Sequence, residues 1–285
     1  MFVAADPAAM RAWSREAAAR GARVALVPTM GALHDGHMAL VERARLDADV
    51  VVLSLFVNPL QFERADDFDR YPRPIDDDLD ICRRHGIDAV YAPTAAAMYP
   101  DGFQTHVVPG PMAALLEGEH RPGHFEGVTT VVAKLFHAVE PRTAVFGEKD
   151  AQQLAIIRRM VVDLDLGIEI VGLPTVREPD GVAMSSRNRR LTEEQRHAAV
   201  CVPRALEAVR SAATAGTSSS DDLVAVGRAV VETEPLARFE HLCIVDPSNL
   251  TPVDRLDTSL PQGSRALVVT AVWFGEVRLI DNCRL

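Results

Sequence analysis

The chain has 285 residues, of which 48% are hydrophobic and 25% are charged, and its formal net charge is -10 at pH 7. This length exceeds the ~100 to 200 residues of a usual single domain, and the composition is that of a globular protein, which excludes a disordered or fibrous chain. The acidic balance argues against non-specific attraction to nucleic-acid phosphates or anionic lipid, so we expect neither nucleic acid nor a membrane as a partner.

The cysteines and the first residues of the chain bear on the cellular compartment in which the protein is expected. Cys82, Cys201, Cys243 and Cys283 lie far apart without a CxxC pair, which is typical of reduced thiols and not of a disulfide framework. Residues 1–20 carry charges where a signal peptide would have an uninterrupted apolar region. No apolar run reaches the ~18 residues of a membrane helix. We therefore expect a cytoplasmic protein.

Short runs rich in β-branched residues alternate with helical patterns up to about residue 175. Continuous apolar runs of this length are typical of strands buried on both faces of a parallel sheet. The pattern predicts an α/β fold with a Rossmann-like, doubly wound sheet, in which ligands bind beyond the carboxyl ends of the strands. We expect strands at 23–28, 49–57, 88–92, 143–147 and 168–172, and helices at 36–46, 75–85, 126–139 and 150–162.

The pattern changes after about residue 175, where a turn-rich stretch is followed by helices and then by strands. A tight connection at Phe274-Gly275-Glu276 predicts a hairpin between the last two strands. We expect a domain at 1–175 and a second, smaller α+β domain at 176–285 that closes over the active site. The expected elements are helices at 192–213 and 223–232, a linker AGTSSSDD between them, and strands at 239–245, 266–272 and 277–280.

The segment VPTMGALHDGH, residues 27–37, contains a strand end, a turn with two glycines and a helix that begins near Gly36. A helix N-terminus offers N–H groups and partial positive charge to a phosphate, and His34 and His37 can each add a donor. The histidines could instead be ordinary helix-cap or surface residues. Zinc is a further alternative, although it needs three or four ligands and the HExxH arrangement is absent.

Two later segments also suit phosphate. In PTVREPDGVAMSSRN, residues 174–188, the hydroxyls of Ser185 and Ser186 and the guanidinium of Arg187 can bind phosphate oxygens. In FGEKDAQQL, residues 146–154, Lys149 offers a point charge to phosphate at another strand-to-helix turn. Each segment has a plain alternative, namely a common loop sequence for the first and a charged helix cap for the second.

The segment FVNPLQF, residues 56–62, follows the strongest predicted strand and contains Gln61, which offers both a donor and an acceptor to a hydroxy-acid. Downstream lies the acidic run Asp76-Asp77-Asp78. At least two of these aspartates suit the N-terminus of a helix, where its dipole stabilises negative charge. One of them could hold Mg²⁺, which prefers carboxylate and phosphate oxygens.

The chain resembles the pantothenate synthetases, also called pantoate-β-alanine ligases, over essentially its whole length. Six segments carry the resemblance in the family's order: PTMGALHDGH, FVNPLQF, YPR, RPGHFEGV, FGEKDAQQL and VREPDGVAMSSRN. The HxGH sequence is the adenylyl-transfer signature of a nucleotidyltransferase superfamily, and SSRN resembles the KMSKS loop of class I adenylate-forming enzymes.

The resemblance implies an ATP- and Mg²⁺-dependent ligase. ATP and pantoate would form pantoyl-adenylate and pyrophosphate, and β-alanine would then attack to release pantothenate and AMP. A homodimer is implied as well. Because an acyl-adenylate hydrolyses in water, we expect the loop at 58–75 or the second domain to close over it.

The resemblance also implies the residues of the ATP site. His37 is the expected catalytic residue, with His34, Lys149 and Arg187 as catalytic partners that supply donors and positive charge to the phosphates. The implied ATP-binding residues are Met30, Gly31, Ala32, Leu33, His34, Asp35, Gly36, His37, Gly147, Glu148, Lys149, Asp150, Val176, Met184, Ser185, Ser186 and Arg187.

For the acids, Gln61 and Gln153 match positions that hold pantoate, and Gln61 also borders the β-alanine position. Tyr71, Arg121 and His124 match residues near this pocket.

Asp77 is the implied magnesium carboxylate. Two positions depart from the family pattern, Ala151 in place of an aromatic and the acidic Glu126.

Three other functions fit parts of this pattern. A nucleotidylyltransferase of the same superfamily would use a phosphate acceptor, which the neutral pair Gln61 and Gln153 disfavours. An aminoacyl-tRNA synthetase would need a basic anticodon-binding region, which is not visible in the sequence. A catalytically inactive nucleotide-binding module would lack the polar residues expected from the family, which are present.

Overall fold

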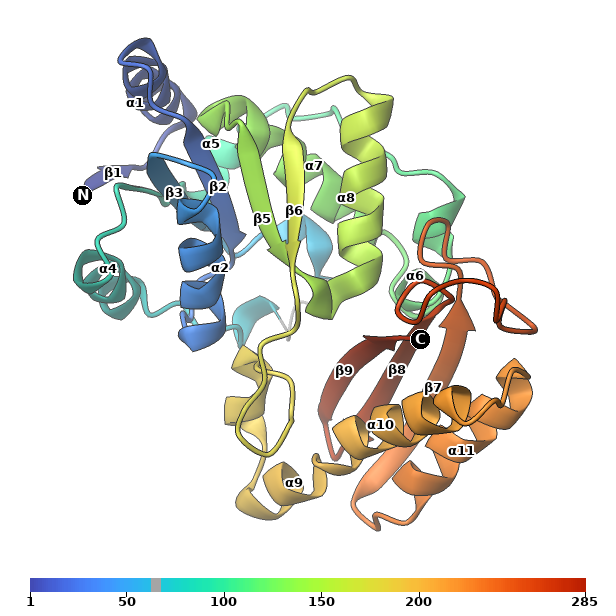
Figure 1. Ribbon diagram of the computed structural model, residues 1–285. Helices are drawn as coiled ribbons and strands as arrows, with labels where there is room; N and C mark the ends of the chain where they lie inside the picture. Colours follow the sequence, from blue (N-terminus) through green and yellow to red (C-terminus); the bar gives the residue numbers. More distant parts are fainter. Residues whose placement is uncertain (63–67) are drawn as a thin grey trace. The chain divides into compact units, whose positions relative to one another are not determined.

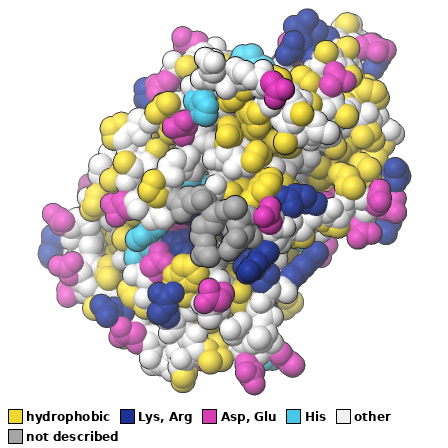
Figure 2. All heavy atoms as spheres, turned by 180° about the vertical axis from the view of Figure 1, so that it is seen from behind, with side chains coloured by type: hydrophobic (Ala, Val, Ile, Leu, Met, Phe, Trp, Pro, Cys, Tyr) yellow, Lys and Arg dark blue, Asp and Glu magenta, His cyan; other side chains and the backbone are white. Residues whose placement is uncertain are grey.

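The computed structural model describes residues 1–62 and 68–285, and the chain divides into two compact units. The first unit comprises residues 1–148 and 152–173, and the second comprises 149–151 and 174–285. Among the described residues, no helix is both long enough and apolar enough to cross a membrane. Figure 2 shows acidic and basic side chains interspersed over one face of the molecule.

The first unit contains a six-stranded parallel sheet in the order β1-β4-β3-β2-β5-β6 (Figure 1). Without the edge strand β1, this is the doubly wound Rossmann order, which confirms the predicted fold class. The strands are β1 (Phe2–Ala4), β2 (Val24–Thr29), β3 (Val50–Leu55), β4 (Ala89–Tyr91), β5 (Thr143–Gly147) and β6 (Glu169–Leu173).

Helices cover both faces of this sheet because alternate residues of each strand point to opposite sides. Leu26 packs in one hydrophobic cluster with α1, α7 and α8, whereas its neighbour Val27 packs in another with α2 and α4. The helical segments of the first unit are α1 (Pro7–Ala19), α2 (Asp35–Arg45), η1 (Pro59–Gln61), α4 (Ile75–Arg84), α5 (Ala95–Met98), η2 (Pro111–Ala114), α6 (Glu117–His120), α7 (His124–Val139) and α8 (Ala151–Asp163). The short helix η3 (Glu148–Asp150) connects β5 to α8 along the chain, and residues 149–151 of this connection are grouped with the second unit.

The second unit is an α+β structure in which helices pack on an antiparallel sheet with the order β7-β8-β9. The two-residue turn at Gly275, which has a φ of +58°, joins β8 to β9 and confirms the predicted hairpin. The elements are η4 (Ser186–Arg190), α9 (Glu193–Ala198), α10 (Cys201–Thr214), α11 (Ser220–Glu232), β7 (Ala237–Val245), β8 (Leu267–Phe274) and β9 (Val277–Arg284).

Two expected elements of this unit are wrong in detail. The single helix expected at 192–213 is two helices, because Pro203 has no N–H to donate to the carbonyl of Ala199 and the helix is interrupted there. The expected linker at 215–222 is partly helical. Ser219 is the N-cap of α11, and its hydroxyl accepts the N–H of Asp222 at 3.4 Å.

Candidate active site

The turn between β2 and α2 brings the two histidines of the HxGH motif together. His34 is the N-cap of α2, and its backbone N–H donates to Nδ1 of His37 at 3.3 Å. The ring centroids lie 4.0 Å apart with an interplanar angle of 38°. Both side chains are partly exposed, so they are accessible to a ligand at the end of the helix. This geometry places two imidazoles beside the positive end of a helix dipole.

The backbone of this turn is already hydrogen bonded by neighbouring side chains. The N–H of Gly31 donates to Thr29 Oγ1 at 3.1 Å. The N–H groups of Ala32 and Leu33 donate to the two carboxylate oxygens of Asp78, each at 2.8 Å. With the bond made by His34, four successive N–H groups are satisfied inside the first unit. The next N–H groups are those of Asp35 and Gly36 at the start of α2, where a helix N-terminus presents donors.

Gln61 lies beside this turn on η1. Its Nε2 lies 3.1 Å from Sδ of Met30, and its Oε1 accepts from Nδ2 of Asn58 at 3.1 Å. Asn58 is 1% exposed, and its Oδ1 accepts from the hydroxyl of Tyr99 at 2.7 Å. Burial raises the pKa of Tyr99, so this hydroxyl stays protonated and remains a donor. Asn58 and Tyr99 orient Gln61, and sequence reasoning did not single out either residue.

The backbone of Gln61 is fixed from the N-terminal end of α7. Nη2 of Arg121 donates to the Gln61 carbonyl at 3.1 Å, and Nδ1 of His124 lies 2.9 Å from the same oxygen. Tyr71 packs edge-on against Phe62 with centroids 5.7 Å apart. The three residues assigned to the surroundings of this pocket therefore contact η1 and its neighbour. Residues 63–67 of the expected closing loop at 58–75 lie outside the described residues.

The two glutamines of the DAQQ sequence have different environments on α8. Gln152 is buried, and its amide donates to the carbonyls of Met112 and Leu115 at 2.9 and 2.7 Å while its Oε1 accepts the N–H of Glu117 at 3.0 Å. Gln153 is partly exposed. Gln152 therefore holds the segment between η2 and α6, which leaves Gln153 as the glutamine of the pair with an accessible side chain.

The acidic run occupies the first turn of α4, as expected, but its members differ. Asp76 and Asp77 are exposed, whereas Asp78 is 2% exposed and bonds to the HxGH turn. One of the two exposed carboxylates would be enough for a magnesium ion that is held mainly by water and substrate phosphates. Of the two departures from the family pattern, Glu126 pairs with His106 at 2.8 Å, and Ala151 begins α8.

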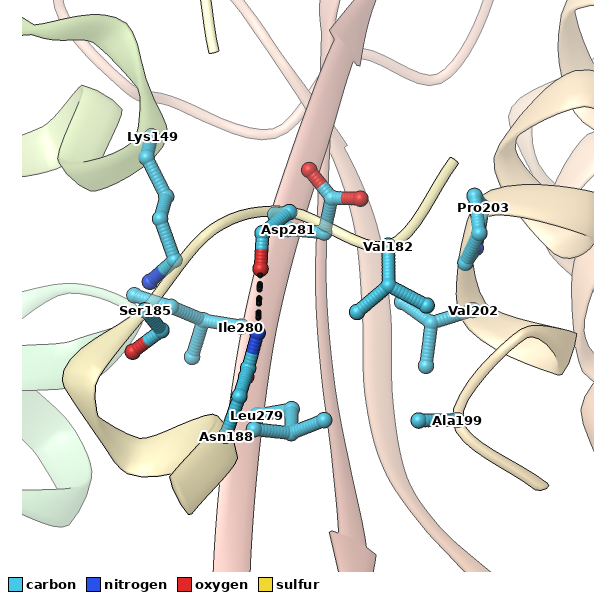
Figure 3. Close-up of a pocket in the computed structure, with 11 residues that line it drawn as sticks. Lys149, Val182, Ser185, Asn188, Ala199, Val202, Pro203, Leu279, Ile280 and Asp281 are labelled. Carbon is cyan, nitrogen blue, oxygen red and sulfur yellow. Dashed lines mark hydrogen bonds between the residues drawn. The ribbon is translucent and has the colours of Figure 1, made fainter. Parts of the chain in front are cut away.

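The second unit brings Lys149 together with the SSRN segment. Both Lys149 and Ser185 line a small pocket, where they lie on the same side in Figure 3. Ser185 is the N-cap of η4, and its Oγ accepts the N–H of Arg187 at 3.2 Å. The dashed line in Figure 3 marks the bond from Nδ2 of Asn188 to the carbonyl of Ala183 at 3.0 Å. Two hydrogen bonds within the SSRN segment and its neighbours therefore fix the shape of this loop next to its polar side chains.

An ion pair between a partly exposed arginine and a buried aspartate supports this loop from β9. Arg177 donates to both carboxylate oxygens of Asp281, at 2.7 and 3.0 Å, and to the carbonyl of Gly181 at 2.9 Å. Nδ2 of the adjacent Asn282 donates to the carbonyl of Lys149 at 2.9 Å. Sequence reasoning missed Asp281 and Asn282, because a strand pattern near the chain end carries no signal for a contact with residues about 100 to 130 positions earlier.

The remaining assigned ATP residues fall on the same two units. Gly147 ends β5 and Glu148 follows it, next to the carboxyl end of β2, where the strand order reverses direction. This reversal is where doubly wound sheets bind ligands. In the second unit, the N–H of Met184 donates to the carbonyl of Val176 at 2.9 Å, and Asp150 is exposed.

The sheet order and the histidine pair at its switch point define a nucleotide-binding α/β enzyme. The sequence model of the pantoate-β-alanine ligase family matches residues 3–284. The chain therefore belongs to the pantoate-β-alanine ligase family, as its motifs predicted.

Known proteins similar to this chain agree with that assignment. A pantothenate synthetase from Roseiflexus castenholzii is 52% identical over 269 residues, which cover 94% of each chain. A crystal structure of pantothenate synthetase from Thermus thermophilus has a TM-score of 0.90 at 46% identity and covers 99% of this chain and 98% of that one. A Francisella tularensis pantoate-β-alanine ligase, whose structure is described as a complex with β,γ-ATP and β-alanine, has a TM-score of 0.80 at 30% identity and covers 100% and 97%.

Proposed function

We propose that this chain condenses pantoate with β-alanine, using ATP, through a pantoyl-adenylate intermediate. A carboxylate oxygen of pantoate attacks the α-phosphorus of ATP, and pyrophosphate leaves. The amine of β-alanine then attacks the acyl carbon, AMP leaves, and the amide of pantothenate remains. Family membership and the ATP and β-alanine named for the Francisella tularensis relative support this reaction.

The observation that carries the proposal is the histidine pair at the sheet's switch point beside Gln61. Charge grows on the oxygen that bridges to pyrophosphate as that bond breaks, so donors directed there stabilise the transition state more than the ground state. His37 is the principal donor of this kind and His34 the second. Gln61 holds pantoate by its side-chain amide, and it is kept beside the histidines by Met30 and Asn58.

Positive charge is needed because attack of a carboxylate on a phosphate joins two anions. Lys149 and Arg187 supply it, and the hydroxyls of Ser185 and Ser186 add hydrogen bonds to phosphate oxygens. Val176 and Met184 line the nucleotide beside this loop. Water must be excluded from the adenylate, and we propose that the loop at 58–75 or the second domain closes over it during the reaction.

The finer roles of the first unit are proposed in the same way. Gln153, the accessible glutamine of α8, is a second contact for pantoate, and Gln61 also borders β-alanine. Mg²⁺ neutralises phosphate charge when it is bound with ATP, and Asp77 is the carboxylate that would hold it. The N–H groups of Asp35 and Gly36 at the start of α2 face phosphate.

We also propose that the protein is a cytoplasmic homodimer. All four cysteines are free thiols, and burial raises the pKa of Cys82 to about 11 and that of Cys201 to about 12, which makes them poor nucleophiles. Such thiols suit a reducing compartment. Light scattering during size-exclusion chromatography tests the dimer, and a mass of one chain at micromolar concentration would exclude it.

The reaction is tested by AMP formation from ATP and Mg²⁺ with pantoate, with and without β-alanine, while pantothenate is followed by mass spectrometry. Pantothenate and AMP should appear in equal amounts only when both acids are present. A dinucleotide formed with a phosphorylated acceptor, and no pantothenate, would instead indicate a nucleotidylyltransferase.

A further inference from the structure

The turn that leads into the HxGH histidines has a backbone conformation that needs support. Gly31 and Ala32 are consecutive residues in the left-handed region, with φ values of +84° and +52°. Alanine is disfavoured there because its Cβ lies too close to the following carbonyl oxygen. Ala32 is also fully buried, with 0% of its surface exposed. Some interaction must therefore hold this residue in an unfavourable conformation.

Asp78 provides that interaction from the first turn of α4. Its two carboxylate oxygens accept the N–H groups of Ala32 and Leu33, both at 2.8 Å, and the residue is only 2% exposed. Successive backbone N–H groups in a turn of this kind form a concave binding site for an anion. Here the anion is a side chain of the protein itself. A Cβ added to Gly31 would lie 2.8 Å from Oδ2 of Asp78, so the turn and the carboxylate are closely fitted.

We infer that Asp78 is a positioning residue for adenylation, an inference that rests on the proposed function. Leu33, whose N–H it holds, directly precedes His34, and the N–H of His34 in turn donates to His37. A change in the direction of this turn displaces His34 at the N-cap of α2 and, through this hydrogen bond, changes the orientation of the His37 ring. The bonds of Asp78 to this turn are to backbone, so it acts on the reaction through the placement of the two rings.

The test compares two variants with the same change of charge in the same helical turn. In Asp78→Asn, the shape is retained, but the amide presents an N–H to one of the two N–H groups, so one hydrogen bond becomes a contact between donors. Asp76→Asn is the matched control, because Asp76 is exposed in the first turn of α4. If Asp78→Asn does not fold, Asp78→Ser supplies the comparison, since a hydroxyl can still accept one N–H.

Two half-reactions distinguish positioning from a general loss of structure. Adenylation is followed as pantoate-dependent exchange of pyrophosphate into ATP, and amide formation is followed with separately prepared pantoyl-adenylate and β-alanine. We expect exchange by Asp78→Asn to fall about 10- to 100-fold, because small misplacements of catalytic groups have effects of this size. Amide formation should change less than about threefold, since the misplaced donors act on the earlier bond-breaking step. Asp76→Asn should stay within about twofold of the wild type in both, as for most surface substitutions.

An equal fall in both half-reactions would show that Asp78 has only a structural role, and unchanged exchange would overturn the inference directly. Absence of exchange in the wild-type protein would overturn the proposed function and, with it, this inference. Wild-type exchange that Asp78→Asn leaves intact would overturn only the inference.

Discussion

A close approach of two backbone segments at Gly127 predicts the effect of adding a single methyl group there. Gly127 on α7 packs against η1, and a Cβ there would lie 2.4 Å from the carbonyl oxygen of Leu60 and 2.7 Å from the N of Gln61. Restoring an ordinary contact of 3.4 Å requires α7 and η1 to separate by about 1 Å. Both neighbours are backbone atoms, so a side-chain rotation cannot relieve the contact. Gly127→Ala should therefore displace Gln61.

We expect kcat/KM for pantoate to fall about 10- to 100-fold in Gly127→Ala, because a displacement of about 1 Å in a substrate-positioning group has effects of that order. Overpacking should also lower the free energy of unfolding by about 1 to 3 kcal/mol. The assay is pantoate-dependent exchange of pyrophosphate into ATP over a range of pantoate concentrations, at a temperature where the variant is folded.

The matched control is Gly110→Ala. Gly110 is exposed with a φ of -74°, and an added Cβ would meet nothing within 4 Å. It should leave kcat/KM within about twofold of the wild type. A folded Gly127→Ala protein with the wild-type kcat/KM for pantoate would refute this prediction. Such a result would mean that η1 shifts without displacing the Gln61 side chain, or that Gln61 does not bind pantoate.

Three further predictions concern catalysis and stability. His37→Ala should lower the rate of pyrophosphate exchange by about 10²- to 10³-fold with an unchanged circular dichroism spectrum, and near-normal turnover would exclude the catalytic assignment. Arg177→Met leaves the buried Asp281 without its partner and should lower the free energy of unfolding in urea by roughly 2 to 3 kcal/mol. The expected loss is smaller than for a fully buried pair because 33% of the Arg177 side chain is exposed. A loss below about 0.5 kcal/mol would contradict this prediction. Burial opposes ionisation of Glu240, but hydrogen bonds and charge from Arg278 outweigh it and lower the pKa to about 2, below the ~4.3 of an unfolded chain. The stabilisation from Glu240 should therefore be complete above about pH 5 and lost as the pH falls toward 2. The difference in unfolding free energy between the wild type and Glu240→Gln should shrink over that range. A difference that stays constant with pH would refute this prediction.

The regular elements of the fold could be predicted from the sequence where one periodicity dominated. The expected strand at 143–147 matches β5 at both ends, and the other expected strands of the parallel sheet lie within two residues of those observed. The edge strand β1 and helix α1 were missed. A strand of three residues is too short to show a period, and Ala-rich α1 has few large apolar residues to mark its buried face.

The family and enzyme class could be predicted because each motif is a continuous stretch of sequence that can be recognised without the structure. The comparisons confirm both. The residues that support the site were less predictable, because their signal lies in three-dimensional contacts. Asp78 looked like its two neighbours in an acidic run, yet it alone of the three is buried against the HxGH turn. Gln152 and Gln153 likewise differ only in the direction of their side chains on α8. The proposed ligand roles remain predictions.

The internally bonded turn before α2 also has a consequence for inhibitor design. The N–H groups of residues 31–34 are already paired with acceptors of the protein, so a phosphate mimic directed at them would have to displace Thr29, Asp78 or the ring of His37. The turn is preorganised before any nucleotide arrives, and its amides should exchange slowly with deuterium in the free protein. Affinity is better sought from acceptors that reach the N–H groups of Asp35 and Gly36 in the first turn of α2, at the positive end of the helix dipole.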